Sequence, residues 1–273
     1  MTKRIWAAQH ALSMLFCLAP SYAARAADLL SQDSAPPSVW IVELGGYGVF
    51  EPRYEGSKSY VTGFKPIIDI HKEGDRVWPF FPNDAITYDL FETSNFRAGP
   101  AGDITLQSRF HSPDVNLQIG KADVNLQGGA FAEIYPVDNV RGRIEVLQGL
   151  TGNTGFSINL MSDYIWKPDA RWTLTAGPRA QIVDDEYASE YFSSQLAIRN
   201  GRYVKYKAEG GLLSAGAELT GTYDWTQNIA TRFFIDYSRL TGDAADSPRV
   251  DLKGSPDQVT VGIGVSYKFK VEH

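Results

Sequence analysis

Apolar and polar side chains alternate strictly along much of this chain, and this pattern constrains the fold more than any other feature of the sequence. It is clearest in the last segment, Gln258–Phe269. Successive side chains of a β-strand point to opposite faces, so the alternation predicts a strand with one apolar and one polar face. Such a strand separates two environments of different polarity. The apolar positions are Val259, Val261, Ile263, Val265, Tyr267 and Phe269, and the others are Thr260, Gly262, Gly264, Ser266 and Lys268.

The same alternation recurs along the chain from Val39 onward, in eleven segments separated by turn residues. A single-chain bacterial membrane barrel has an even number of strands, so we expect about 12 strands, with ten as the alternative. A further strand is expected in Val77–Phe91 or Tyr187–Tyr206, and no helical periodicity of useful length is present. The segments are Val39–Phe50, Val61–His71, Ala85–Phe91, Phe96–Phe110, Ala122–Tyr135, Val140–Gln148, Phe156–Trp166, Trp172–Ile182, Leu213–Tyr223, Ile229–Ser238 and Gln258–Phe269.

The N-terminus has the pattern of a secretory signal. Two basic residues precede an apolar stretch, Ile5–Leu18, which is shorter than the roughly 20 residues that a membrane-spanning helix needs. Small residues then flank Arg25, so we expect cleavage after Ala26, with Ala23 as the alternative. The predicted organisation is a signal peptide at 1–26, a flexible leader at 27–38 and one β-barrel domain at 39–273.

The composition of the mature chain excludes several classes of function. Removing 26 residues from 273 leaves 247, and the only cysteine, Cys17, leaves with the signal. No disulfide or thiolate site is therefore expected. The signal also carries three of the 26 basic residues and none of the 32 acidic ones, so the mature net charge is 23 − 32 = −9. An acidic chain has no electrostatic reason to bind nucleic acid.

Alternation alone fits a soluble barrel as well, so the choice of a membrane barrel depends on the connections. Aromatic residues flank the short turns, as Trp166 and Trp172 do around Lys167–Arg171, and interfacial girdles place Trp and Tyr at that level. Short turns alternate with long connections, of which the longest are Asp184–Lys207 and Thr241–Asp257. Outer-membrane barrels have short periplasmic turns and long extracellular loops, so we predict an antiparallel transmembrane barrel.

Charges of both signs lie on the polar faces of the predicted strands, where they would face the lumen of a membrane barrel. They could line a channel, or they could pair across the interior and close it, and a barrel of about 12 strands allows either. The expected pairings are Arg141 and Arg143 with Glu145, Asp163 or Glu218, and Arg179 and Arg232 with Asp236.

Little in the sequence indicates catalysis or metal binding. The mature histidines, His71, His111 and His273, show no serine and acid at the spacing of a triad on adjacent strands, so we expect no catalytic residues. Two acidic groups could supply oxygen ligands for Ca²⁺, but they lack a recognised spacing, and we expect neither metal nor cofactor. For Asp243 and Asp246, side-chain hydrogen bonds to the backbone of a tight loop are the expected role. The groups are Asp184, Asp185, Glu186 and Glu190, and Asp243, Asp246 and Asp251.

A specific motif follows the penultimate strand: Gly242, Asp243, Ala244, Ala245, Asp246, Ser247 and Pro248. With Gly254–Gln258 and the ending Tyr267-Lys-Phe269, it resembles the C-terminal signature of the MipA/OmpV family of outer-membrane proteins. The resemblance covers essentially the whole mature chain. Its other elements, in the order of the family, are Pro52–Ser57, Gly99–Gly102, Gly128–Glu133 and Glu186–Phe192.

The resemblance implies an integral outer-membrane barrel of a Gram-negative bacterium, in contact with its lipid. For the name-giving member it implies a scaffold that links a murein-degrading lytic transglycosylase to a bifunctional peptidoglycan synthase. Because one fold serves many functions, a small pore and a surface adhesin or antigen remain alternatives, as do different oligomeric states. The sequence departs from the pattern in its tail, Lys270–His273, which follows the terminal aromatic residue, and at Arg249, where an aliphatic residue is expected.

Overall fold

The computed structural model describes residues 39–74, 78–105, 125–151, 155–199, 202–252 and 254–272. These belong to one compact unit that begins at Ser38. The predicted signal peptide with its cleavage site at Ala26, the leader, and parts of the segments Phe96–Phe110 and Ala122–Tyr135 lie outside the described residues. Among the described residues, the helices are too short or too polar to cross a membrane.

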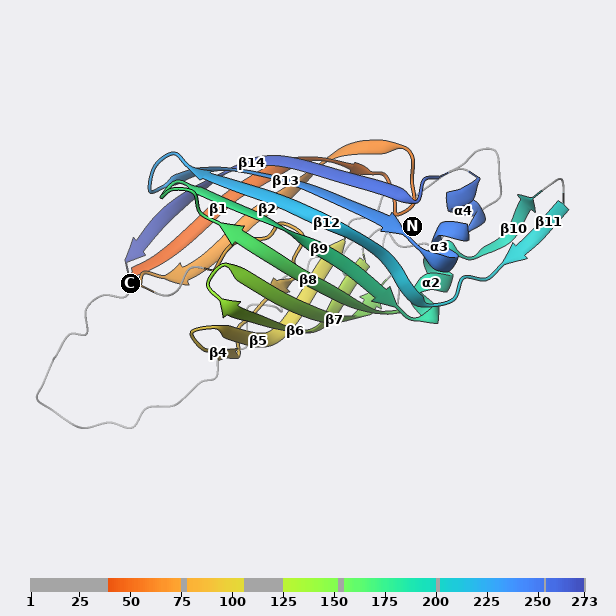
Figure 1. The fold of residues 1–273 in the computed structure, drawn as a ribbon, viewed down its shortest axis with the longest axis horizontal. Coiled ribbons are helices and arrows are strands. Elements are labelled where there is room, and N and C mark those ends of the chain that lie inside the picture. The colour runs from red at the N-terminus through yellow and green to blue at the C-terminus, as the bar shows by residue number, and fades with distance from the viewer. Residues whose placement is uncertain are drawn as a thin grey trace, which may run out of the picture. The chain divides into compact units, whose positions relative to one another are not determined.

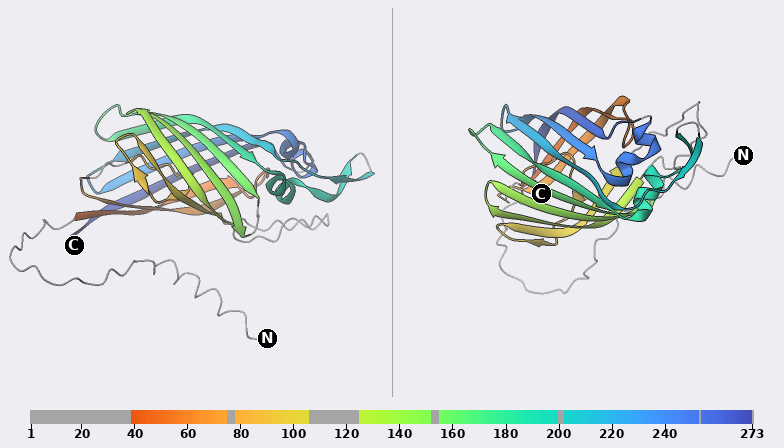
Figure 2. Two further views of the ribbon diagram at one scale, coloured as in Figure 1. Left: turned by 90° about the horizontal axis from the view of Figure 1, so that it is seen from below. Right: turned by 45° about the vertical axis from the view of Figure 1, so that its right-hand side comes forward.

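Antiparallel strands form one twelve-stranded sheet, here called the wall, that curls around an interior (Figures 1 and 2). The order of neighbours is β2-β1-β14-β13-β12-β9-β8-β7-β6-β5-β3, and β4 also pairs with β5. The wall strands are β1 (Val39–Pro52), β2 (Tyr60–Lys72), β3 (Ile86–Thr87), β4 (Phe91–Glu92), β5 (Phe96–Thr105), β6 (Asn125–Val137), β7 (Val140–Thr151), β8 (Phe156–Trp166), β9 (Trp172–Val183), β12 (Gly211–Asp224), β13 (Ile229–Leu240) and β14 (Asp257–Glu272).

This architecture confirms the predicted all-β antiparallel barrel, and each of the eleven alternating segments contains wall strand. The first and last strands are neighbours, with Val39 opposite Glu272 and Phe50 opposite Val261. Both ends of the wall chain therefore meet at one end of the barrel, here called the terminal end. The short turns between β8 and β9 and between β12 and β13 lie at the same end. The opposite end is called the cap end.

The two faces of the wall differ as the alternation predicts. On β14 the side chains of Val259, Ile263, Val265, Tyr267, Phe269 and Val271 are exposed, with 66% of Ile263 accessible, whereas Gln258 and Ser266 are buried. Large apolar side chains on an outer surface match a hydrocarbon environment, and the polar ones between them face the interior. Ion pairs and hydrogen bonds satisfy many of the polar groups inside.

Three short helices and a hairpin, which the sequence pattern does not predict, stand at the cap end (Figure 1). The helices are called the cap, and their apolar side chains cluster over the ends of β9, β12 and β13 around Phe192, Leu240 and Val250. The hairpin forms a separate two-stranded sheet and adds no strand to the wall. Its residues lie in the region Tyr187–Tyr206, where a further wall strand was one expectation. The elements are α2 (Asp185–Phe192), α3 (Gly242–Asp246), α4 (Pro248–Asp251), β10 (Ser194–Arg199) and β11 (Arg202–Tyr206).

Candidate functional site

A segment between β2 and β3, Trp78–Ala85, passes through the interior of the wall and is here called the luminal segment. Phe80 packs against a buried cluster from β1, β2 and β13 that includes Tyr47 and Phe234. On the other side, the guanidinium carbon of Arg141 on β7 lies 3.7 Å from the ring centre of Phe81. The segment therefore contacts strands from distant parts of the wall.

Polar contacts also join the luminal segment to the wall. The Asn83 amide donates a hydrogen bond to Glu218 on β12 and accepts one from Lys65 on β2, at 3.0 Å. The backbone N–H of Ala85 donates to Glu145 Oε1 on β7, at 3.0 Å. Because these bonds reach β2, β7 and β12, they hold the segment across the lumen rather than against one strand.

Arg141 is the centre of a buried charge network beside this segment. Its side chain is 0% exposed, and it donates to Glu133 Oε2 at 2.9 Å and to Asp163 Oδ2 at 2.8 Å. It also pairs with Asp84 of the luminal segment. A guanidinium carries five N–H donors in a fixed plane, so one arginine can bind several carboxylates at once.

The network extends along neighbouring strands. Arg143 pairs with Glu145 at 2.7 Å and with Glu133 at 3.0 Å. Arg179 bridges Asp163 and Glu218, at 2.7 and 2.9 Å. A buried carboxylate or guanidinium without a partner is very costly, and each charge of this network has at least one partner of opposite sign. The charge network consists of Arg97, Glu133, Arg141, Arg143, Glu145, Asp163, Arg179 and Glu218, together with Asp84.

The expected pairing of Arg232 with Asp236 is wrong. Arg232 binds Glu43 on β1, with a shortest N–O distance of 2.5 Å, and Asp236 lies opposite Glu218 in the register of β12 and β13. Residues four apart along a strand are separated by about 13 Å, beyond the reach of a direct ion pair. The sequence pattern does not identify Glu43 as a luminal charge, because a single carboxylate in a mainly apolar segment is weak evidence for an ion pair.

The arrangement is one of packing contacts, ion pairs and hydrogen bonds. Its arginines bind carboxylates and backbone carbonyls, and its aromatic side chains are packed, so the described groups hold the luminal segment in place. The sequence leaves open whether the lumen is open or plugged, and in the described part of the chain the luminal segment lies across it, in contact with β2, β7 and β12.

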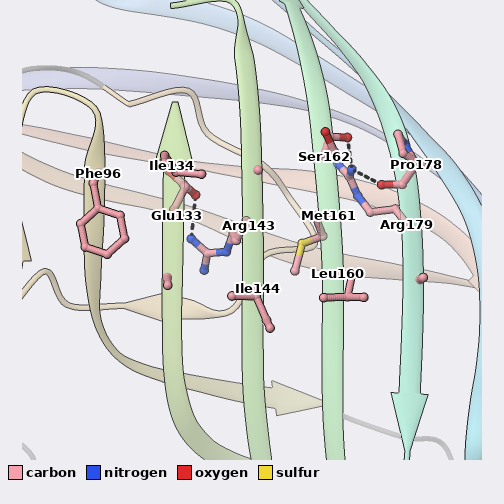
Figure 3. Close-up of a pocket in the computed structure, with 13 residues that line it drawn as sticks. Phe96, Glu133, Ile134, Arg143, Ile144, Leu160, Met161, Ser162, Pro178 and Arg179 are labelled. Atoms are coloured by element: carbon pink, nitrogen blue, oxygen red, sulfur yellow. Dashed lines mark hydrogen bonds and ion pairs between the residues drawn. The ribbon is translucent and has the colours of Figure 1, made fainter. Parts of the chain in front are cut away.

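An apolar hollow of about 540 Å³ lies on the outer side of β5–β9 (Figure 3). Exposed Ile134, Ile144 and Leu160 border it, and Gly142 leaves space between them. Figure 3 also draws the bond between Arg143 and Glu133, two residues of the charge network that lie next to the hollow. The hollow belongs to the apolar outer surface.

The predicted signature loop, Gly242–Pro248, forms α3 and the start of α4. Its hydrogen bonds hold these helices against α2 and the residues before β12. Ser247 Oγ donates to the carbonyl of Phe192 at 2.6 Å and accepts from the N–H of Arg249. Asp243 Oδ2 accepts from the N–H of Glu209, at 2.9 Å. This is the backbone-capping role that the sequence suggested for Asp243.

The other acidic group, in and before α2, is also used for backbone contacts. Asp184 is the N-cap of α2, and its Oδ1 accepts from the N–H of Tyr187 at 2.8 Å. Asp185 Oδ1 accepts from the N–H of Gly210 at 2.7 Å. An acidic N-cap satisfies a backbone donor that the helix cannot. These carboxylates stabilise the connection from β9 to β12.

Arg249, the residue that departs from the family pattern, lies on α4 and is buried within the cap. Its guanidinium carbon lies 4.1 Å from the ring centre of Tyr54, and its Nη1 donates to the carbonyl of Tyr191 at 2.6 Å. The neighbouring Glu55 lies in the turn between β1 and β2. Burial raises the pKa of the Glu55 carboxyl to about 7, against an opposing attraction to Arg249.

We therefore expect the cap to lose stability as the pH rises. The folded-state pKa of Glu55 is raised above its ordinary value of 4.5, so its stabilising contribution is complete below pH 4.5 and is lost as the pH rises through about 7. Hydrogen exchange of the turn 53–59 and the cap, followed from pH 5 to pH 8, measures this. Glu55→Gln should remove the pH dependence, and Lys58→Gln, an exposed change in the same turn, should keep it. Equal pH dependence in Glu55→Gln and the unchanged chain would disprove the assignment.

Several known proteins resemble this chain. A porin described as NanC shares 8% identity, with a TM-score of 0.41 over 84% of this chain and 100% of the porin. An outer-membrane channel of the COG4313 group from Pseudomonas putida F1 shares 11% identity, with a TM-score of 0.40 over 89% of this chain and 100% of the channel. Neisserial surface protein A shares 9% identity, with a TM-score of 0.28 over 84% of this chain and 97% of that protein. Among curated proteins, none matches.

The family described as MltA-interacting protein MipA matches residues 44–269. The match runs from β1 to the last aromatic residue of β14, so it includes the charge network, the luminal segment and the signature loop. This agrees with the resemblance carried by the sequence motifs. The chain belongs to the MltA-interacting protein MipA family.

Proposed function

We propose that this protein is a non-enzymatic scaffold of the outer membrane that links a murein hydrolase to a peptidoglycan synthase. Membership of the family described as MltA-interacting protein carries the proposal, because that description names a protein partner. The luminal segment supports it, since this segment and the charge network lie in the interior that a permanently open pore needs. The signal peptide is cleaved on export in this proposal.

The short turns of the terminal end are the proposed docking face. With both ends of the wall chain in the periplasm, this end faces the peptidoglycan layer. The turn between β8 and β9 has exposed Lys167 and Arg171, and Asp169 holds it by accepting from the N–H groups of Arg171 and Trp172. Changing the two basic side chains therefore leaves these backbone hydrogen bonds in place and removes one bond to the wall, from Arg171 to the hydroxyl of Tyr223 on β12.

Co-purification tests the proposal. A tagged mature chain, extracted in detergent, should enrich a lytic transglycosylase and a bifunctional synthase over an unrelated outer-membrane barrel. A chain with Lys167→Glu and Arg171→Glu should enrich less of both enzymes. The matched control, with Lys205→Glu and Lys207→Glu at the cap end, should enrich as much as the unchanged chain. Enrichment no greater than that of the unrelated barrel would rule out the scaffold.

A further inference from the structure

The wall has a gap between β2 and β3, where the row of hydrogen-bonded strands ends in the described part of the chain. Because β3 and β4 both pair with β5, the row has eleven positions, and neighbours in it are antiparallel. The strands on the two sides of the gap therefore run in the same direction. One strand of opposite direction fits between them, and unpaired backbone groups facing lipid are unfavourable without it.

The chain that connects β2 to β3 has the direction that the gap requires. It leaves β2 at the terminal end and rejoins the wall at β3, further toward the cap end. Turns mark both its ends: Gly74 has φ +95°, and Asp84 N–H bonds to the carbonyl of Phe81 at 3.4 Å. Tight turns at both ends of a short segment are typical of a strand in a β-meander.

The luminal segment also lies beside β2 already. Phe80 packs against the cluster that contains Ile67, and Lys65 Nζ donates to Asn83 Oδ1 at 3.0 Å. A two-residue turn at Glu73–Gly74 would place Phe80 opposite Ile67 in a hairpin. The segment thus follows β2 antiparallel, but inside the lumen rather than in the plane of the wall.

We propose that the luminal segment is a displaced wall strand, and that its movement into the gap between β2 and β3 opens the lumen as a gated pore for small hydrophilic solutes. The same residues block the lumen in one position and complete an even-stranded wall in the other. This activity is separate from the proposed scaffold and does not depend on it.

Local chemistry explains why the closed position is preferred. Pro79 and Pro82 lack an N–H group, so the segment forms fewer ladder hydrogen bonds in the wall than another sequence would. In the lumen, Asn83 and Asp84 bind Glu218 and Arg141, and leaving them exposes buried charges. The open position is therefore the less populated one, and the pore opens briefly.

Paired cysteines can hold the segment in either position, because the only native cysteine is Cys17, in the predicted signal. The lumen pair is Asn83→Cys with Glu218→Cys, joined by a short reducible dithiol cross-linker. The wall pair is Ile68→Cys with Pro79→Cys, which the hairpin register places opposite each other. Ile68 is 61% exposed on the outer face, so a disulfide there requires the segment to lie in the wall.

The proposal is tested by measuring planar-bilayer current through each variant in potassium chloride, before and after reduction of the cross-link. We expect brief openings of the unchanged chain, none with the lumen pair cross-linked, and their return on reduction. The chain with the wall pair should form its disulfide and conduct continuously until the disulfide is reduced.

The control is Thr175→Cys with Thr220→Cys. The native hydroxyl oxygens of these two threonines lie 2.7 Å apart on neighbouring wall strands, so this pair should leave the current unchanged. Failure of the wall pair to cross-link in folded barrels, or current unaffected by both pairs, would overturn the proposal. Enzyme capture by these variants reports on the scaffold separately.

Discussion

Replacing Arg141 with alanine is expected to lower the free energy of unfolding by about 3–5 kcal/mol, the cost of removing one partner of a buried ion pair. The guanidinium is 0% exposed and lies between Glu133, Asp163 and Asp84. Without it, carboxylates from two wall strands and the luminal segment face one another with less compensation. We expect the change to loosen the luminal segment as well, because Asp84 loses its partner.

Urea unfolding in lipid vesicles, followed by heat-modifiable gel mobility, measures this effect. The matched control is Arg239→Ala, which removes an arginine–carboxylate pair with Asp257 of similar length, 2.7 Å, but on the exposed surface. Solvent screens that pair, so its loss should hardly change the unfolding midpoint. If Arg141→Ala were as stable as Arg239→Ala, the charge network would not be what holds the interior together.

The faces of the strands could be predicted from the sequence, because a two-residue period is a local property. Final-strand residues such as Ile263 lie outside and Ser266 lies inside, as the alternation requires. Arg141, Arg143 and Glu145 reach the lumen for the same reason. Their partners follow from the register of β6, β7 and β8, which places Arg141 opposite Asp163.

Features that depend on distant contacts could not be predicted. The luminal segment has no period, and its prolines only mark it as a poor strand, so its course depends on contacts with β7 and β12. α2 is eight residues long, too short for a clear helical period, and it is held by the cap. Glu43 pairs with Arg232 across 189 positions of sequence, a contact that only the closing of β1 against β14 creates.

Removing the luminal segment is expected to have the largest effect on function. Replacing Trp78–Asp84 with glycine and serine residues of equal number would remove the aromatic packing against Tyr47 and Phe234 and the bonds to Glu218 and Arg141. The wall strands and their register would remain. A barrel of about twelve strands has an interior wide enough for water when side chains do not fill it. We therefore expect this variant to conduct continuously.

The direct measurement is planar-bilayer conductance of the two folded chains, with heat-modifiable mobility as proof of folding. The account predicts that the unchanged chain shows no sustained current and that the chain without the luminal segment shows a steady one. A steady current through the unchanged chain, of the same size as in the variant, would contradict the claim that this segment closes the barrel.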